Sequence, residues 1–323
     1  MTAGDALALA VLFGIDVRGA AVRPLAGGYS NESMRIDAAA GSYVARRYGR
    51  LHVSRGAIAF EHVVIAHAAR RMDEIVAPLR TADGETIVAP AGGGLASVSP
   101  YVAGETGRRD LATACAAARV LARFHRAVRD VHVVSGLRTA RFLGTLPWLR
   151  ERFLRNAADP LVGRKLDWTA LVTATTAAAA RVAPRAGDLP SVIVHGDPNP
   201  GNVVCVEPGV VRGLIDFDFV HETERVYDVG ALIDEFARPG DDAALDLALV
   251  SPLVAAYAGE APLSATERAT LPDALLRHAA TLAWYVATRH GERIPGDIGS
   301  AGRYAARVAE IAANVDAIRS AAE

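Results

Sequence analysis

The sequence has few of the residues that several common classes of protein need. Only two cysteines, Cys115 and Cys205, occur among 323 residues, too few for a disulfide framework or a structural zinc site. No run of about 18 or more apolar residues is present, so we expect no membrane-spanning helix. The 35 basic side chains nearly balance the 36 acidic ones, which disfavours a general nucleic-acid binder. We therefore expect a reduced, cytoplasmic protein without membrane or nucleic-acid partners; nothing indicates its oligomeric state.

Lysine is almost absent as well, since Lys165 is the only one in the chain. Any chemistry that needs a lysine must therefore use Lys165 or accept an arginine. The apolar residues 6–15 follow Asp5 and no basic residue, whereas a signal peptide needs positive charge before its apolar stretch. We expect a short helix there that ends near Gly14.

The hydrophobic pattern divides the chain into two unequal parts. Short segments rich in β-branched or aromatic residues, separated by glycine-containing turns, predict strands at 18–24, 33–37, 42–48 and 95–98. Residues 54–72 have helical spacing, and a hairpin is expected over 77–89, around Asp83-Gly84. After Gly104 the pattern becomes helical, apart from apolar strands expected at 192–194, 203–206 and 211–215. We predict a small lobe over 1–98, a connector over 99–104 and a larger, mainly helical lobe over 105–323, with a ligand cleft between the lobes.

The strongest local signal is the run H-G-D-P-N-P-G-N at residues 195–202, which lies between two predicted strands. A second segment, I-D-F-D at residues 215–218, follows the next strand. These segments supply carboxylates and one amide. A carboxylate and an amide oxygen suit Mg²⁺, and a remaining carboxylate can accept a proton from a hydroxyl nucleophile.

The two segments resemble the catalytic core of the kinase-like small-molecule phosphotransferases, the superfamily of aminoglycoside phosphotransferases, choline kinases and type II homoserine kinases. The resemblance implies an α+β, bilobal, protein-kinase-like fold with a small antiparallel-sheet lobe. By matching position, Asp197 would be the catalytic base, and Asn202 and Asp216 the magnesium ligands. His195 would orient the loop rather than shuttle protons.

Other interpretations of these motifs were weighed. A chance or purely structural match must explain eight residues in fixed order together with a correctly spaced I-D-F-D segment. A metallohydrolase using His195, Asp197 and Asp216 lacks the additional histidines expected of such a site. A nucleotide-binding pseudokinase conflicts with the intact set of Asp197, Asn202 and Asp216. A protein kinase conflicts with the absence of an A-P-E segment.

The N-terminal part has further matching features. Gly27, Gly28, Ser30 and Asn31 match the family's Gly-Gly-x-[Ser/Thr]-Asn loop, whose backbone N–H groups can approach a phosphate closely. Arg46 stands where a kinase places its phosphate-binding lysine, and its planar, permanently charged group can serve the same purpose. Glu61 matches the glutamate that pairs with this cation; the alternatives for both residues are solvated surface charges.

The connector resembles the family segment that contacts the purine. Because Pro100 cannot donate a backbone hydrogen bond, we expect Ser99 and Tyr101 to contact the adenine. His125 and Asp228 match family positions too, and we expect both to be structural.

The reaction implied is magnesium-dependent transfer of the γ-phosphoryl group of ATP, or of GTP, to a hydroxyl group of a small molecule. Residues 216–262 carry 11 acidic side chains against Arg225 and Arg238. Such an excess favours a cationic acceptor, and an aminoglycoside or other antibiotic, including a macrolide or nucleoside, is therefore expected; a solvated helix face would explain the same count. The alternative is a metabolic kinase of the homoserine kinase type, whose acceptor needs an arginine for its carboxylate.

Overall fold

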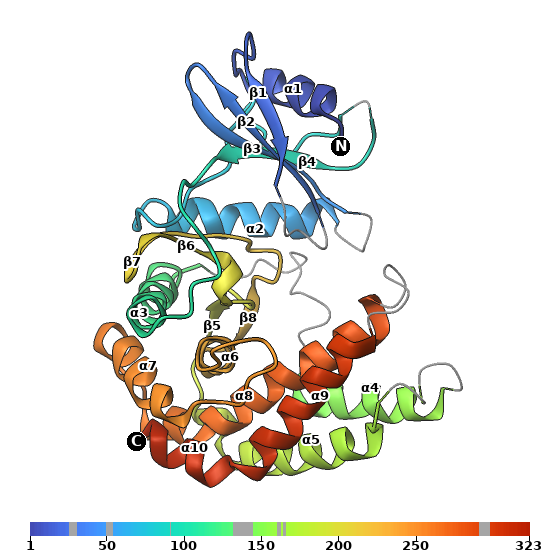
Figure 1. Ribbon diagram of the computed structural model, residues 1–323, viewed down its shortest axis with the longest axis vertical. Helices are drawn as coiled ribbons and strands as arrows, with labels where there is room; N and C mark the ends of the chain where they lie inside the picture. Colours follow the sequence, from blue (N-terminus) through green and yellow to red (C-terminus); the bar gives the residue numbers. More distant parts are fainter. Residues whose placement is uncertain are drawn as a thin grey trace.

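The computed structural model describes residues 1–25, 31–49, 54–90, 92–131, 145–159, 163, 166–290 and 298–323. It has two lobes, a small one built on an antiparallel sheet and a larger one that is mainly helical (Figure 1). The expected α+β bilobal fold is confirmed.

The small lobe is organised around one four-stranded antiparallel sheet in the order β1-β2-β3-β4. Its strands are β1 (Ala21–Pro24), β2 (Glu32–Ala38), β3 (Gly41–Arg47) and β4 (Ala96–Pro100). Helix α1 (Ala3–Leu12) packs on the sheet through a cluster that includes Leu9, Ile36 and Val98. Gly14, at φ 75°, follows the helix end, as the sequence predicts.

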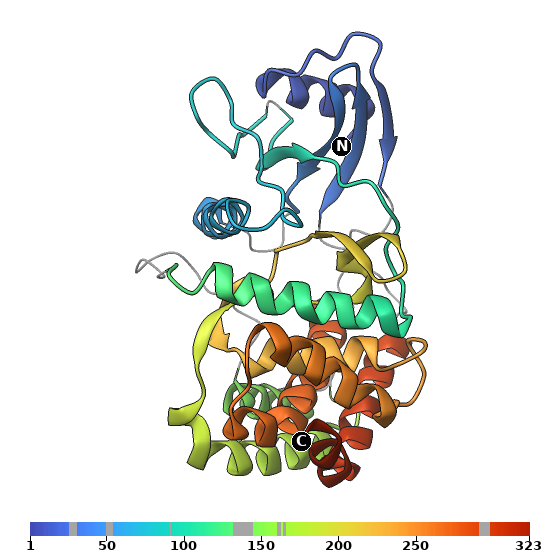
Figure 2. The same ribbon diagram turned by 90° about the vertical axis from the view of Figure 1, so that its left-hand side faces the viewer.

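Helix α2 (Arg55–Ala68) begins at Ser54, whose side chain accepts a hydrogen bond from the Ala57 N–H. It lies between the sheet and the larger lobe, and Figure 2 shows it end-on above α3. Its residues Phe60 and Val64 belong to the hydrophobic cluster of the larger lobe. Helix α2 thus belongs to the first part of the chain by sequence but packs into the core of the larger lobe. The predicted lobe limits, 1–98, 99–104 and 105–323, stay predictions.

The expected hairpin over residues 77–89 is wrong. Its turn is present, since Gly84 N–H donates to Thr81 O, but the flanking segments form no paired strands. Leu79 N–H instead donates to Val98 O, and Val88 exchanges two hydrogen bonds with Ala96. Beside the turn the Thr81 N–H donates to Glu85 O, but beyond it both flanks bond to β4 and not to each other.

The segment after β4 is fastened to the larger lobe. Glu105 and Cys205 exchange two backbone hydrogen bonds of 2.8 Å. Gly104, at φ 150°, lies so close that a Cβ atom there would stand 2.5 Å from Cys205 O. Only glycine allows this approach.

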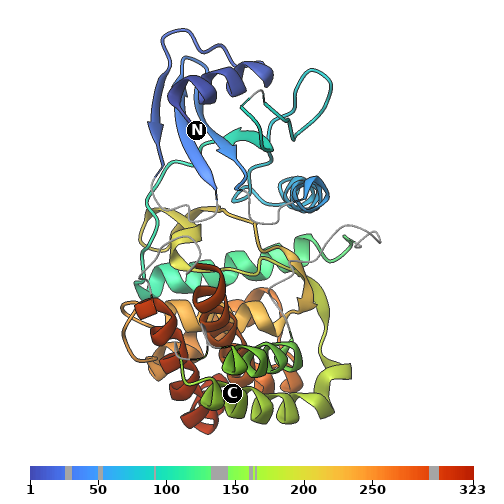
Figure 3. The same cartoon turned by 90° about the vertical axis from the view of Figure 1, so that its right-hand side faces the viewer.

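The larger lobe contains most of the helices, seen from the opposite side in Figure 3. Its α-helices are α3 (Leu111–Ala127), α4 (Leu146–Ala158), α5 (Trp168–Val182), α6 (Val226–Phe236), α7 (Leu247–Glu260), α8 (Ala265–Tyr285), α9 (Ile298–Ala313) and α10 (Val315–Ala322). Short helical turns occupy Ala183–Asp188, Pro200–Asn202 and Val286–His290. In the described part of the chain, no helix is both long and apolar enough to cross a membrane.

Two strand pairs lie at the top of this lobe, facing the sheet. β6 (Val203–Glu207) pairs with β7 (Val210–Leu214), and β5 (Ser191–Val194) pairs with β8 (His221–Glu224). The polar run of β8 gave no strand signal in the sequence. Together the two pairs present the segments 195–202 and 215–218 to the space between the lobes.

Candidate active site

His195 joins the two motif segments. It is fully buried, and its Nε2 lies 3.0 Å from Ile215 O, so the Nε2–H donates to the residue before Asp216. Its Nδ1 accepts from the Asp197 N–H at 3.3 Å. Burial lowers the pKa of His195, which favours the neutral ring that these two contacts require.

Asp228, in the first turn of α6, anchors the same loop. Its carboxylate accepts from the His195 N–H at 2.7 Å and from the Gly196 N–H at 2.9 Å. His125 Nε2 donates to it at 3.0 Å, and His125 Nδ1 lies 2.7 Å from Tyr257 Oη. His125 and Asp228 are thus structural, as expected.

Asp197 and Asn202 are in direct contact. Asn202 Nδ2 donates to Asp197 O at 2.9 Å and to Asp197 Oδ2 at 3.0 Å. Burial raises the pKa of Asp197 to about 7, and the charges of Asp216 and Glu235 act in the same direction. A carboxylate with such a pKa is suited to exchanging a proton near neutral pH.

Asp216 follows β7 in a strained backbone conformation. With φ 66° it is the one non-glycine residue at positive φ in the described part of the chain, and such strain is typical of functional positions. Ile215 N–H donates to Asn202 O at 3.0 Å. This hydrogen bond brings the second motif segment against the first.

Arg46, on β3, occupies the centre of an acidic cluster from both lobes. Its Nη2 lies 2.6 Å from Asp216 Oδ1 and 3.2 Å from Asp218 Oδ1, and its Nη1 lies 3.8 Å from Glu61 Oε1. Burial alone would lower the pKa of Arg46, but these three acids raise it above its usual value. The predicted partners Arg46 and Glu61 are therefore brought together with Asp216.

Asp218 is a site residue that had no predicted role, although it closes the I-D-F-D motif. Its Oδ2 accepts from Asn31 Nδ2 at 2.5 Å, and Asn31 Oδ1 accepts from the Gly49 N–H at 3.1 Å. Burial raises the pKa of Asp218 to about 6. Asn31 is thus tied to the acidic cluster, whereas Gly27, Gly28 and Ser30 lie outside the described residues.

The connector differs from the expectation. Tyr101 N–H donates to Ser42 O at 2.9 Å, and Ser99 is the register partner of Val44. Since hydrogen-bonding direction alternates along an antiparallel strand, the backbone groups of Ser99 and Tyr101 face β3. The Pro100 C=O then points away from β3, and Pro100 and Val102 both line the cavity described below.

One cavity of about 690 Å³ unites these groups. Apolar side chains line its end under the sheet: Val44, Ile65, Val76, Val204 and Leu214. Arg46, Asp197, Asn202 and Asp216 lie along its wall, and the other end is lined by polar and aromatic side chains that include Tyr227, Glu235, His278 and Tyr304. No local motif marked this last group in the sequence.

The acidic excess of residues 216–262 is not an unpaired negative surface. Most of its acids have arginine partners, which come largely from other segments: Glu224 with Arg277, Glu235 with Arg307, Asp241 with Arg109 and Arg303, and Glu260 with Arg123 and Arg126. Counting charges along one segment missed these long-range pairs.

The sequence comparisons agree with this geometry. A family model described as "Phosphotransferase enzyme family" matches residues 21–264. The chain belongs to this family. A homoserine kinase from Mesorhizobium japonicum is 27% identical over 249 residues, covering 77% of this chain and 74% of the relative. One from Phenylobacterium zucineum is 35% identical over 102 residues, and this match spans only 30% of that relative's length.

Solved structures of this phosphotransferase type share the fold. A microcompartment-associated aminopropanol kinase superposes with a TM-score of 0.70 at 16% identity, covering 96% of each chain. The amicoumacin kinase hAmiN also reaches 0.70 at 16% identity, covering 98% of this chain and 93% of that one. The resemblance of the two motif segments to kinase-like phosphotransferases is thereby confirmed.

Proposed function

We propose that this protein transfers the γ-phosphoryl group of ATP, or of GTP, to a hydroxyl group of a small molecule in a Mg²⁺-dependent reaction. The observation that carries the proposal is the convergence of Asp197, Asn202 and Asp216 with Arg46 on the wall of one cavity. Positioning and charge stabilisation supply most of the catalysis in phosphoryl transfer, and these side chains can provide both.

The nucleotide would enter under the sheet. The apolar side chains at this end can enclose a purine, and the Pro100 C=O and Val102 N–H can bond to its edge. Arg46 would then face the phosphates with its planar fork. That Gly27, Gly28 and Ser30 bind the phosphates stays a prediction from the family resemblance. Ser99 and Tyr101 line the same end with their side chains.

Asn202 and Asp216 fit a magnesium ion by their chemistry, because one offers an amide oxygen and the other a carboxylate. Asp218 adds a second carboxylate beside Asp216, since both contact Arg46. Bound there, the ion would neutralise charge on the phosphates.

Asp197 would act as the base. As the alcohol oxygen attacks the γ-phosphorus, its proton passes to the Asp197 carboxylate, the bond from the γ-phosphorus to the bridging β–γ oxygen breaks, and ADP leaves. Asn202 orients Asp197 through its two hydrogen bonds, and His195 holds the loop.

For the acceptor, an antibiotic is supported by the family resemblance, but the arginine-paired acids remove the argument for a cationic compound. A metabolic kinase acting on a small amino alcohol or hydroxy amino acid is the second candidate. The match to the homoserine kinase from Mesorhizobium japonicum over 77% of this chain favours it.

The substitution Asp197→Asn tests the reaction. We expect ADP release with a panel of alcohols, including kanamycin, choline and homoserine, to fall about 10²- to 10⁴-fold, as for loss of a general base. The thermal shift caused by Mg-ATP should change little. Asp188→Asn, at an exposed position, is the control, and wild-type turnover in Asp197→Asn would contradict the assignment.

A further inference from the structure

Tyr227 on α6 and His278 on α8 are each 1% exposed, and both line the cavity. Tyr227 Oη and His278 Nδ1 are the two unpartnered buried side-chain atoms of the cavity wall, among the described residues, that do not belong to an arginine. The Thr281 hydroxyl stands near Tyr227 but donates to Arg277 O. Buried polar groups are nearly always paired, and leaving one unpaired is costly. These two atoms therefore point to a missing ligand.

Both groups line the same cavity as Asp197. Tyr227 immediately precedes Asp228, whose carboxylate binds the His195 and Gly196 N–H groups. Burial raises the pKa of Tyr227, and the charge of Asp197 adds to this effect. Asp197 also helps to raise the pKa of His278. A ligand that contacts these two atoms is thus placed next to the proposed base.

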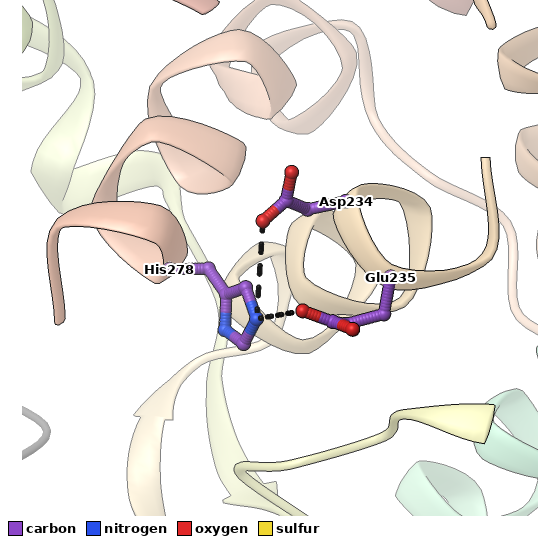
Figure 4. Close-up of side chains that lie close together, drawn as sticks. All are labelled: Asp234, Glu235 and His278. Atoms are coloured by element: carbon purple, nitrogen blue, oxygen red, sulfur yellow. Dashed lines mark hydrogen bonds and ion pairs between the residues drawn. The ribbon is translucent and has the colours of Figure 1, made fainter. Parts of the chain in front are cut away.

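The surroundings of His278 favour its protonated form. Its Nε2 lies 3.4 Å from Glu235 Oε1 and 4.0 Å from Asp234 Oδ2 (Figure 4). Burial alone would lower the pKa of His278, but the Glu235 hydrogen bond and the nearby acids raise it above its usual value. A raised pKa favours the protonated ring, in which Nε2–H faces Glu235 and Nδ1–H is a charged hydrogen-bond donor towards the cavity.

The three side chains in Figure 4 have ligand atoms within 4.8 Å of one another, a spacing that a metal ion could use. Arg238 and Arg307 already bind these acids, with Arg238 Nη2 3.0 Å from Asp234 Oδ1 and Arg307 Nη1 2.8 Å from Glu235 Oε1. A metal ion would have to displace both guanidinium groups. The cluster is therefore better explained as the charge support of His278.

We propose that the acceptor alcohol carries a carboxylate, which the Tyr227 hydroxyl and the His278 Nδ1–H bind beside Asp197. This inference rests on the proposed function and names its substrate class, a hydroxy acid. The Tyr227 hydroxyl and the Nδ1–H of a protonated His278 are two donors, and a carboxylate has two oxygens that can accept from them in charge-assisted hydrogen bonds. Arg303 on α9 also lines the cavity, where its Nη1 lies 3.7 Å from both Asp241 and Asp242.

Paired acceptors that differ by the carboxylate test this inference. We would compare L-serine with ethanolamine, L-homoserine with 3-aminopropan-1-ol, and D-gluconate with D-sorbitol in a coupled ADP assay. In at least one pair, the acid should be phosphorylated with a kcat/KM at least about ten times that of its partner. Equal or better use of every compound without a carboxylate would overturn the inference while leaving the proposed function intact.

Substitutions locate the carboxylate. Tyr227→Phe should raise the KM for the acid about ten- to a hundred-fold, as expected for losing a hydrogen bond to a charged group, without changing the KM for ATP or for the uncharged partner. His278→Asn keeps a donor near the Nδ1 position and should retain more affinity than His278→Gln, which keeps one near Nε2. Tyr43→Phe, at a tyrosine that does not line the cavity, is the control for folding and activity.

A binding measurement separates the two proposals. Thermal shift with each acid in the presence of Mg-ADP reports acceptor binding without turnover. An acid that stabilises the wild type but not Tyr227→Phe supports the inference even if no alcohol is phosphorylated, a result that would refute the proposed function alone. Phosphorylation of kanamycin or an amino alcohol, with no acid bound in a Tyr227-dependent way, would refute the inference alone.

Discussion

At the scale of single residues, the arginine at position 46 has the largest consequences. Its two terminal nitrogens divide among three acids, Asp216, Asp218 and Glu61, which come from different parts of the chain. A lysine has one compact charge and cannot span these positions as a planar fork can. Glu61 is only 5% exposed, so it depends on this partner for its charge.

Arg46→Lys should therefore raise the KM for ATP by on the order of ten-fold while preserving the fold. Arg46→Ala leaves buried acids without a counter-ion and should lower the free energy of unfolding by about 3 kcal/mol. Steady-state kinetics and urea unfolding measure the two effects. Arg47→Lys is the matched control, because Arg47 follows on the same strand but pairs with Asp5 and Glu32; similar behaviour of both Lys variants would argue against the role of Arg46.

At the scale of elements, the loop between β5 and β6 has a fixed shape because α6 and α3 hold it. Asp228 on α6 accepts three hydrogen bonds in the interior, two of them from loop N–H groups and one from His125 on α3. Gly196 has φ 85°, and a Cβ atom there would stand 2.3 Å from Phe219 O. The loop therefore requires both the glycine and the buried acid.

Asp228→Asn tests this anchoring. An amide has one acceptor oxygen and brings an N–H group towards donors, so we expect a loss of about 3 kcal/mol of stability together with a lower kcat. Asp167→Asn, which replaces the exposed N-cap of α5, should cost almost nothing, because Asn caps helices as well as Asp does. Unchanged stability of Asp228→Asn in urea titrations would show that the loop does not depend on this carboxylate.

The elements also show which sequence inferences succeed. The glycine-containing turns and apolar runs predicted the sheet, and the two motif segments predicted how Asp197, Asn202 and Asp216 converge. Local sequence patterns failed to predict secondary structure where contacts distant in the sequence determine it. The flanks of the expected hairpin bond to β4, and β8, although its sequence is polar, pairs with β5. Tyr227 stands next to Asp228 in a segment that matches the family but had no predicted role, and His278 belongs to no motif; α6 packs against α8, and both residues line the cavity of Asp197.

At the scale of the whole molecule, each lobe buries a histidine that must stay neutral. In the small lobe, His62 lies 2.9 Å from Tyr48 Oη and 2.8 Å from Thr86 Oγ1; in the larger lobe, His221 Nδ1 lies 2.8 Å from Phe219 O. Burial lowers the pKa of each to about 4. In the unfolded chain, a histidine has a pKa of about 6.5.

These two histidines should make each lobe less stable in acid. Between about pH 4 and 6.5 each of them binds more protons in the unfolded chain than in the folded protein, so each contributes a fall in the free energy of unfolding of about 1.4 kcal/mol per pH unit as pH falls. Asp197 and Asp218, whose pKa values burial raises to about 7 and about 6, contribute in the opposite direction, so the test is the change in slope when a histidine is replaced. His62→Gln and His221→Gln should each reduce the slope by that amount in urea titrations at several pH values. His67→Gln, at a histidine paired with Asp130 near the surface, should change this slope less. Equal slopes in all three variants would contradict the conclusion that His62 and His221 are buried as neutral histidines.

The placement of α2 bears on control of the enzyme. Phe60 and Val64 share a hydrophobic cluster with Leu121 and Phe124 of α3, so the helix that carries Glu61 is built into the larger lobe. Swinging Glu61 away from Arg46 would require pulling these side chains out of that core. A change that parted Glu61 from Arg46 would therefore also have to disturb the hydrophobic core between α2 and α3.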